Sequence, residues 1–519
     1  MWRRLQPIAQ RYERHFGDRV VRCFRDRPAS VQAMLADIIV RYPERESLVG
    51  PEGRLTYAAL DARTERLAAG LRAQGIEPGD RVAILIGNRG AFVEALLACL
   101  RLGVVAVPLG IRMAAPEITY CLEDCGAVGL IHQPDGLDLP DTTDSLRMTL
   151  STDAEPGGSG DVPWAMVDEE ETVCILYTSG TTGRPKGAML TGLGIVHSAL
   201  HFRYAMALDE TDRTLLAVPG SHVTGLLAAV MTTLGMGGAL VIQETFRAAT
   251  CLDLIARERV TNTILVPAMY NLMLLEPDLD RHDLSAWRIG GYGGAPMPQA
   301  TIAGLAERLP GLGLMNAYGA TELTSAATLL PVALAGARSD SIGGAVHCAD
   351  IRIMDEDGAE VAPGETGELW VAGPIVVPGY WGNPTATAEN FIAGYWRSGD
   401  VGSMDADGLV QIFDRRKDVI NRGGYKVYSA EVENVLAAHP GVLECAVIGD
   451  ACPVLGERVR AIVVPKAGGA DALAQGILDH ARTHLSDYKL PERIDLRTDP
   501  LPRNANGKVL KAALRGGPA

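Results

Sequence analysis

A short apolar run that leads into a loop of small residues is the stretch of this sequence with the clearest chemistry. Residues 174–177 are apolar, with β-branched and aromatic side chains, and predict a buried strand. The next six residues, Thr178, Ser179, Gly180, Thr181, Thr182 and Gly183, carry hydroxyls or no side chain. Glycine lets a ligand approach the main chain, and successive N–H groups form a concavity for oxyanions. Lys186 adds a cation, so the stretch predicts a polyphosphate-binding loop.

The loop is not a Walker P-loop, because that motif closes with Gly-Lys-Ser/Thr, whereas Pro185 precedes Lys186 and Gly187 follows it. This excludes the usual kinase or GTPase interpretation. The stretch 174–187 instead resembles the phosphate loop of the adenylate-forming superfamily: acyl-CoA synthetases, peptide-synthetase adenylation domains and beetle luciferases. The resemblance, closest to the acyl-CoA synthetases, implies that ATP activates a carboxylate as an acyl-adenylate, which is then passed to a thiol.

Further motifs of the same superfamily follow in the same order along the chain, and the resemblance covers roughly residues 31–514. It implies that Thr321 binds the α-phosphate, that Glu322 and Thr182 hold Mg²⁺, and that Lys508 bridges the carboxylate and the α-phosphate. The implied ATP- and AMP-binding residues are Thr178–Gly183, Lys186, Gly294, Ala295, Pro296, Asn316, Tyr318, Gly319, Thr321, Asp400 and Arg415. Of these, Asp400 and Arg415 hold the ribose, and Gly293–Pro296 faces the adenine.

The remaining implied roles concern the acyl group, the hinge and the thiol. His222 is a catalytic residue that also lines the acyl pocket, together with Tyr292 and Gly293. Lys417 is the hinge of domain alternation, and Gly423 and Gly424 line the tunnel for coenzyme A. Two positions depart from the usual pattern of the family: Ser221 stands where an aromatic residue is common, and Tyr292 where many members carry a small residue.

Three other functions are alternatives to a CoA ligase. A stand-alone enzyme that loads an acyl carrier protein remains the main alternative. Amino-acid-activating members carry an aspartate for the substrate ammonium, but residues 218–222 contain no acid, which favours a fatty or aryl acid with an uncharged tail. A luciferase-like oxygenase is a rarer outcome. A non-catalytic nucleotide-binding regulator would be expected to lack Glu322 or Lys508, and both are present.

The elements that must position these residues predict an α/β fold. Helices alternate with apolar strands between residues 31 and 131, which indicates parallel sheets covered on both faces. The predicted ligand loops follow strands, and in such sheets the ligand crevice lies at the carboxyl ends of the strands. Alternating strands after residue 342 indicate a β-rich subdomain, followed by a small mobile α+β domain with a helix from Ser429 that this serine caps.

The predicted organisation is therefore a basic extension (1–28), a large ATP- and acyl-binding domain (29–414), a hinge (415–418) and a small C-terminal domain (419–519). The extension carries eight arginines, and a helix with a basic, solvated face is the plain interpretation. Its acidic residues argue against a transit peptide.

The amino-acid composition limits the classes of partner that the protein is expected to bind. A net charge of −15 argues against nucleic acid, and nine scattered cysteines with no C-x-x-C pair fit a reduced compartment such as the cytoplasm. Residues 214–243 lack acids, lysine and arginine, but glycines and a proline interrupt them, so a buried helix and strand are predicted rather than a transmembrane segment. The expected small-molecule partners are the carboxylate, ATP with Mg²⁺, and coenzyme A; peripheral membrane contact and a homodimer stay open.

Overall fold

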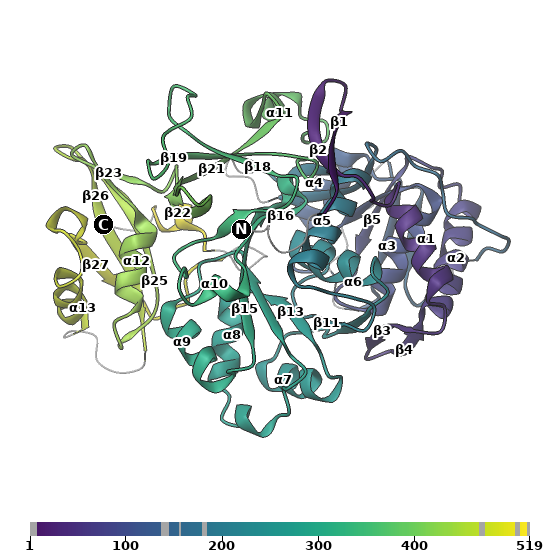
Figure 1. Ribbon diagram of the computed structural model, residues 1–519, viewed down its shortest axis with the longest axis horizontal. Helices are drawn as coiled ribbons and strands as arrows, with labels where there is room; N and C mark the ends of the chain where they lie inside the picture. Colours follow the sequence, from purple (N-terminus) through teal and green to yellow (C-terminus); the bar gives the residue numbers. More distant parts are fainter. Residues whose placement is uncertain are drawn as a thin grey trace. The chain divides into compact units, whose positions relative to one another are not determined.

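The chain forms two compact units in the computed structural model, which describes residues 8–135, 137, 145–154, 157–178, 184–466, 473–503 and 509–515 (Figure 1). Unit 1 comprises Met1–Ile351 and Val371–Arg397, and unit 2 comprises Arg352–Trp370 and Ser398–Ala519. The chain thus passes between the units three times. The predicted domain boundaries and the hinge at 415–418 remain predictions.

A six-stranded sheet in unit 1 carries the predicted phosphate loop. Its order is β10-β9-β6-β5-β7-β8, parallel throughout except that β10 is antiparallel to β9. Buried apolar residues fill these strands, as expected for strands covered on both faces. The strands are β5 (Arg81–Leu85), β6 (Val105–Pro108), β7 (Gly129–His132), β8 (Met148–Ser151), β9 (Thr172–Thr178) and β10 (Lys186–Thr191).

A longer sheet in unit 1 carries the other predicted ATP-binding segments. Its path within the unit is β17-β16-β15-β14-β13-β11-β12-β3-β4, with β3, β12, β11, β13, β14 and β15 mutually parallel. The strands are β3 (Glu46–Gly50), β4 (Gly53–Thr56), β11 (Arg213–Leu216), β12 (Ala239–Ile242), β13 (Asn262–Leu265), β14 (Ile289–Gly293), β15 (Gly313–Ala320), β16 (Ser325–Leu329) and β17 (Gly343–Ala345).

Helices cover both faces of both sheets, which confirms the predicted α/β class with stacked, largely parallel sheets. The largest core lies between the sheets and joins Val82 of β5 and Leu240 of β12 to the helices packed between them. A second core packs α4 on the outer face of the six-stranded sheet, and a third packs α7, α8 and α9 on the long sheet. The helices are α1 (Val31–Arg41), α2 (Tyr57–Ala73), α3 (Gly90–Leu102), α4 (Ala115–Cys125), α5 (Gly192–Ala205), a π-helix (Thr224–Met231), α6 (Thr232–Leu234), α7 (Ala248–Arg257), α8 (Pro267–Leu274), α9 (Gln299–Arg308), α10 (Val332–Ala335) and α11 (Pro384–Asn390).

The buried helix and strand predicted for residues 214–243 are present as the π-helix, α6 and β12. Within the residues that the structure describes, no helix is long and apolar enough to cross a membrane.

Unit 2 is an α+β unit with its own cores. Its sheet has the order β24-β23-β26-β25, with β27 parallel to β26. Val432 of α12 and Ile477 of α13 pack on one face, and Leu514 of α14 packs on the other. The elements are β22 (Leu409–Arg415), β23 (Ile420–Arg422), β24 (Tyr425–Val427), α12 (Ser429–Ala437), β25 (Val442–Cys452), β26 (Gly456–Pro465), α13 (Leu473–Arg482), β27 (Arg493–Leu496) and α14 (Lys511–Leu514); β18 (Asp350–Met354), β19 (Gly367–Ala372), β20 (Phe391–Ile392) and β21 (Tyr395–Met404) complete the chain.

The capping role predicted for Ser429 is wrong. Ser429 is the first helical residue of α12, and its hydroxyl donates to Asp414 Oδ2 at 2.7 Å instead of capping the helix. The hydroxyl binds the carboxylate of Asp414, fifteen residues earlier in the chain, instead of a backbone N–H of its own helix. A local sequence pattern does not contain this contact.

The helix predicted for residues 1–28 is wrong for the described part of that segment. Residues 10–24 form an antiparallel hairpin of β1 (Gln10–His15) and β2 (Arg19–Phe24). The three-residue turn Phe16–Asp18 places Phe16 at φ 50° and Gly17 at φ 82°, the left-handed conformation that short hairpin turns use. Phe24 is buried and stacks on the ring of His197 in α5, so the hairpin is packed into unit 1.

Arg27, just after the hairpin, ties it to the rest of unit 1. Its guanidinium pairs bidentately with Glu13 and with Glu169, at donor–acceptor distances of 2.7–3.0 Å. The Arg27 hydrogen bonds hold the pKa of Glu13 well below its usual range. Because the folded-state pKa is depressed, this stabilisation is present above the pKa of the unfolded chain and is lost as the pH falls below it.

We therefore expect Arg27→Met to destabilise the hairpin by about 2 kcal/mol, since two partly buried carboxylates lose their common partner. Hydrogen exchange of the amides in residues 10–24 measures this directly. Wild-type protein should lose protection in the same segment as the pH falls below about 4, because Glu13 then takes up a proton more readily in the unfolded segment than in the folded one. Arg14→Met, at an exposed position of β1, is the matched control. Equal protection in both variants would contradict the anchoring role.

Candidate active site

The phosphate loop predicted from the sequence connects two paired strands. Thr178 ends β9, Lys186 begins β10, and the two residues are register partners. The Thr178 hydroxyl donates to the carbonyl of Lys186 at 3.4 Å, which closes the base of the loop. The loop residues themselves, Ser179, Gly180, Thr181, Thr182 and Gly183, lie outside the described residues, so their predicted roles stay predictions.

Helix α4 holds both ends of this loop. The Tyr177 hydroxyl donates to Asp124 Oδ2 at 2.7 Å, and the Tyr120 hydroxyl donates to the carbonyl of Pro185 at 3.2 Å. The guanidinium of Arg184 lies 5.5 Å from the centre of the Tyr120 ring, within cation–π range. Burial raises the pKa of Tyr177, so its hydroxyl stays a donor. Sequence reasoning missed Tyr120 and Asp124; their spacing of four on a helix next to the loop was the available signal.

We expect Asp124→Asn to raise the KM for ATP about fivefold, because a charge-assisted hydrogen bond at an exposed site is worth about 1 kcal/mol. Acid-dependent ATP–pyrophosphate exchange measures this effect. Glu123→Gln, exposed on the same helix, serves as the control. An unchanged KM in Asp124→Asn would show that the loop needs no such anchor.

The predicted magnesium carboxylate follows the carboxyl end of β15. Thr321 and Glu322 lie on a single 3₁₀ turn (Thr321–Leu323) between β15 and β16. Gly319 must be glycine, because a Cβ there would lie 1.7 Å from the carbonyl oxygen of Ser325. Thr324 and Ser325 adopt φ values of 47° and 105°, which are rare for residues with a side chain and mark a strained backbone beside Glu322.

One tyrosine connects the carboxylate with the lysine at the loop exit. The hydroxyl of Tyr380 donates to Glu322 Oε1 at 2.9 Å, and Lys186 Nζ lies 5.0 Å from the centre of the Tyr380 ring. The structure therefore brings together two residues that the sequence placed in separate motifs. Tyr380 itself was not predicted, and its only signal was an aromatic residue in the glycine-rich stretch 379–382.

The strand end predicted to face adenine is bare and accessible. Gly293 is the register partner of Ala317, and a Cβ on Gly293 would lie 2.4 Å from the Ala317 carbonyl oxygen. Gly294 has φ 78°, and residues 294–296 are exposed. Asn316, Tyr318 and Gly319 lie on the adjacent strand β15, and the Asn316 side chain donates to the carbonyl of Ser341. A flat ring can therefore approach main chain here.

His222 lies in the loop that follows β11, at the carboxyl edge of the same sheet. Its Nδ1 accepts a hydrogen bond from the backbone N–H of Thr224 at 3.4 Å, and burial lowers its pKa. At neutral pH the imidazole is thus uncharged, with Nε2 as the donor. Asn88 fixes this loop, because its side chain accepts from the N–H of Gly220 and donates to the carbonyl of Val218. Sequence reasoning missed Asn88.

Tyr292 lies on β14 in the core beneath α7, α8 and α9, where only 1% of its surface is exposed and burial raises its pKa to about 12. Its predicted role in the acyl pocket, like those of His222 and Gly293, stays a prediction.

The predicted ribose residues form a pair within unit 2. Asp400 and Arg415 are register partners on β21 and β22, and Arg415 Nε lies 2.6 Å from Asp400 Oδ1. Ser398, whose hydroxyl donates to the carbonyl of Leu369, also accepts the N–H of Asp400. Asp400 is 3% exposed, so the pair is preformed and firmly held.

The predicted hinge and thiol-tunnel residues also lie in unit 2. Lys417 is in the turn after β22, where the Arg415 carbonyl accepts the N–H groups of Asp418 and Val419. Gly423 and Gly424, at φ 61° and 91°, form the two-residue turn between β23 and β24, for which glycine is favoured. Their roles in catalysis stay predictions, and Lys508 lies outside the described residues.

The metal-ligating and charged groups of unit 1 fit a nucleotide that is bound together with Mg²⁺. Glu322 supplies a hard carboxylate oxygen of the kind that Mg²⁺ prefers, Lys186 supplies a cation over the ring of the tyrosine that binds Glu322, and the exposed residues 294–296 leave room for a base. Thr182, the second predicted metal ligand, lies outside the described residues.

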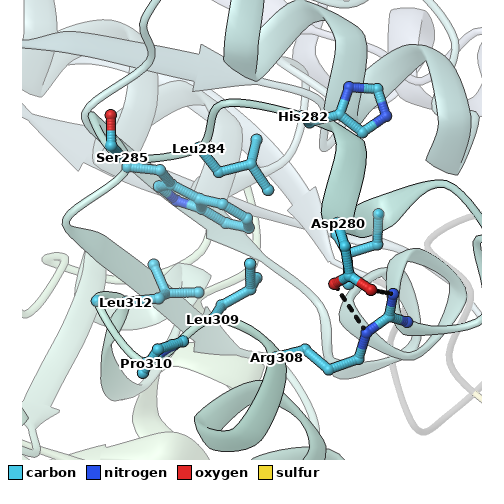
Figure 2. Close-up of a pocket in the computed structure, with 11 residues that line it drawn as sticks. Asp280, His282, Leu284, Ser285, Arg308, Leu309, Pro310 and Leu312 are labelled. Atoms are coloured by element: carbon cyan, nitrogen blue, oxygen red, sulfur yellow. Dashed lines mark hydrogen bonds and ion pairs between the residues drawn. The ribbon is translucent and has the colours of Figure 1, made fainter.

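A separate pocket of about 310 Å³ lies away from these residues (Figure 2). It is lined by Trp287 and Leu312, which precede β14 and β15, and therefore opens at the amino ends of the strands. Arg308 is paired with Asp280 at its rim, as the dashed lines of Figure 2 show. The predicted site lies at the opposite, carboxyl ends of these strands, so this pocket is not part of it.

Comparison with known proteins gives two family matches. The description "AMP-binding enzyme" matches residues 35–381, and "AMP-binding enzyme C-terminal domain" matches residues 431–508.

Individual relatives and solved structures match along almost the whole chain. A feruloyl-CoA synthase of an Amycolatopsis species is 40% identical, over 89% of this chain and 93% of its own. The long-chain fatty acid–CoA ligase FadD13 of Mycobacterium tuberculosis is 35% identical, over 91% and 95%. The o-succinylbenzoate coenzyme A synthetase of Bacillus subtilis, solved with ATP and a magnesium ion, is 30% identical with a TM-score of 0.83, over 93% and 98%.

Proposed function

Because this chain belongs to the AMP-binding enzyme family, we propose that it activates a fatty or aryl carboxylate with ATP and transfers the acyl group to coenzyme A. It is an AMP-forming acid–thiol ligase with ATP, a carboxylate and coenzyme A as substrates. The observation that carries the proposal is that Lys186, at the exit of the phosphate loop, lies over the ring of Tyr380, while the hydroxyl of the same tyrosine binds Glu322.

The reaction has two steps. A carboxylate oxygen of the acid attacks the α-phosphorus of ATP, the bond between the α-phosphorus and the bridging oxygen breaks, and pyrophosphate leaves. The thiol sulfur of coenzyme A then attacks the carbonyl carbon of the acyl-adenylate, AMP leaves, and the thiol proton passes to solvent. In both steps the protein mainly holds anions together and neutralises charge.

Different residues of this chain are proposed to bind the metal, the phosphates and the ribose. Glu322 would hold Mg²⁺, which would supply positive charge for the phosphate oxygens, and Lys186 adds positive charge at the phosphate loop. Asp400 would accept the ribose hydroxyls, and its ion pair with Arg415 would hold the carboxylate in its orientation. Lys508 bridges the reacting carboxylate and the α-phosphate in the first step.

Two observations support an uncharged acyl tail. Residues 218–222 contain no acid that could pair with a substrate ammonium, and His222 is uncharged at neutral pH. Two of the three relatives described above are a feruloyl-CoA synthase and a long-chain fatty acid–CoA ligase, and neither is named for an acid with an ammonium group. We therefore propose aryl and fatty acids as the substrate class and exclude amino acids.

A coupled AMP-release assay over a panel of acids tests the proposal. With wild-type enzyme, ATP and Mg²⁺, ferulate or a fatty acid should release AMP only when coenzyme A is present, and phenylalanine should release none. If AMP release is independent of coenzyme A but requires an added acyl carrier protein, the protein is a carrier-loading enzyme and not a CoA ligase.

Location and assembly form a further part of the proposal. ATP and coenzyme A are both supplied in the cytoplasm, which supports a cytoplasmic enzyme. The sequence leaves a homodimer open, and light scattering of the full chain distinguishes a dimer from a single chain by its mass.

A further inference from the structure

The segment 377–381, here called the strap, lies along the edge of the six-stranded sheet. The N–H of Met189 donates to the carbonyl of Gly379, and the N–H of Trp381 donates to the carbonyl of Gly187 at 2.7 Å. Tyr380 forms an antiparallel bridge with Ala188 between these bonds. Because β10 is the last strand of that sheet, the strap continues the sheet just beyond the phosphate loop.

The strap is also hydrogen-bonded to the turn 321–323, which carries the proposed magnesium ligand Glu322. The N–H of Val377 donates to the backbone carbonyl of Glu322 at 3.0 Å, and the Tyr380 hydroxyl donates to the Glu322 side chain at 2.9 Å. The Thr324 hydroxyl donates to the carbonyl of Ile375 at 2.7 Å, immediately before the strap. The strap thus connects two segments, β10 and the 321–323 turn, that belong to different sheets.

The Tyr380 ring has little freedom to move. Only 5% of its surface is exposed, its N–H donates to the Thr387 hydroxyl, and the ring packs edge-to-face on Phe391. On the outer side of the strap, Arg19 of the N-terminal hairpin donates to the carbonyls of Val377 and Pro378.

We propose that Tyr380 is a positioning residue for the adenylation step, which orients the Glu322 carboxylate for Mg²⁺ and fixes its distance from Lys186. The two functions use different parts of one side chain: the hydroxyl holds the carboxylate, and the ring face attracts the ammonium. This inference rests on the proposed function, because it assumes that Glu322 binds the metal of the ATP complex.

The two parts of the side chain can be removed separately. Tyr380→Phe keeps the ring and deletes the hydroxyl, whereas Tyr380→Leu removes both. Outer hydrogen bonds to metal ligands commonly change metal affinity by about 10- to 100-fold. Tyr395→Phe is the matched control, since the Tyr395 hydroxyl bonds a different carboxylate, that of Asp350, within the same unit.

Three measurements are made on each variant. Electron paramagnetic resonance measures the affinity for Mn²⁺ in the presence of α,β-methylene-ATP, which cannot react. Acid-dependent ATP–pyrophosphate exchange measures adenylation, and consumption of coenzyme A from presynthesised acyl-adenylate measures the second step. We expect Tyr380→Phe to weaken Mn²⁺ binding about tenfold and to slow exchange, with the second step unchanged. Tyr380→Leu should weaken exchange further, and Tyr395→Phe should match wild type.

Wild-type Mn²⁺ affinity in Tyr380→Phe would overturn the inference. An equal loss of both half-reactions would also overturn it, because the proposed role is confined to adenylation. Hydrogen exchange over residues 375–381 confirms that the isosteric variant keeps the strap in place. Absence of pyrophosphate exchange in wild-type enzyme would instead refute the proposed function, so the two failures are distinguishable.

Discussion

Glu322→Gln is expected to lower kcat/KM for acyl-adenylate formation by about 100-fold, the scale of losing one major electrostatic stabiliser. The substitution removes a charge with almost no change in volume. The amide oxygen of glutamine can still accept the hydrogen bond from Tyr380, so the strap keeps its partner. The loss therefore reports the charge that Mg²⁺ requires rather than a displaced backbone. ATP–pyrophosphate exchange with saturating acid measures it.

Glu360→Gln provides a matched control for this prediction, because Glu360 is an exposed carboxylate paired with Arg352 in unit 2. It should retain the wild-type rate. If Glu322→Gln exchanges pyrophosphate at the wild-type rate and with normal Mg²⁺ dependence, Glu322 is not a ligand of the metal.

Lys508→Ala and Lys417→Pro are expected to damage opposite half-reactions. Lys508 is proposed to bridge the carboxylate and the α-phosphate, so its loss should slow ATP–pyrophosphate exchange at least 100-fold. Thioester formation from presynthesised acyl-adenylate should stay within a few-fold of wild type, because the phosphoryl chemistry is already complete. Proline at position 417 fixes φ near −65° and should hinder rotation at the proposed hinge, which slows the thioester step and spares exchange.

The hinge can be tested in this way because Lys417 lies in a turn and not in a strand. The N–H groups of Asp418 and Val419 close that turn on the Arg415 carbonyl, and Arg515 donates to the Lys417 carbonyl. If both variants stay folded and lose both half-reactions equally, domain alternation about Lys417 is wrong for this enzyme.

The parallel sheets could be predicted from the sequence because their strands are buried on both faces and therefore read as continuous apolar runs. Residues 174–177 and 239–242 are examples, and both lie inside observed strands. The proposed ligand segments share one position in the fold: Gly293 ends β14, and Glu322 and the loop after Thr178 follow the carboxyl ends of β15 and β9.

The N-terminal hairpin could not be predicted from charge. Its arginines suggested a solvated basic helix, but Arg27 is neutralised by Glu169, which is 142 residues away in the chain. Local sequence does not contain that information. The turn at Phe16 and Gly17, followed by two valines, was the signal that favoured strands, and the surrounding charges concealed it.

Tyr380 was missed for the same physical reason. Its two partners, Glu322 and Lys186, lie 58 and 194 positions earlier in the chain, so neither periodicity nor a local motif connects them to it. Motifs point to the groups that are proposed to contact substrates, whereas the groups that hold those side chains in place are visible only in the three-dimensional structure.

The products formed from ATP test the central claim most directly. Phosphorus-31 NMR of a reaction containing wild-type enzyme, ATP, Mg²⁺, coenzyme A and ferulate or a fatty acid distinguishes the bond that is broken. An AMP-forming acid–thiol ligase should yield AMP and pyrophosphate together with one acyl-CoA per ATP. ADP and orthophosphate as products would contradict the account.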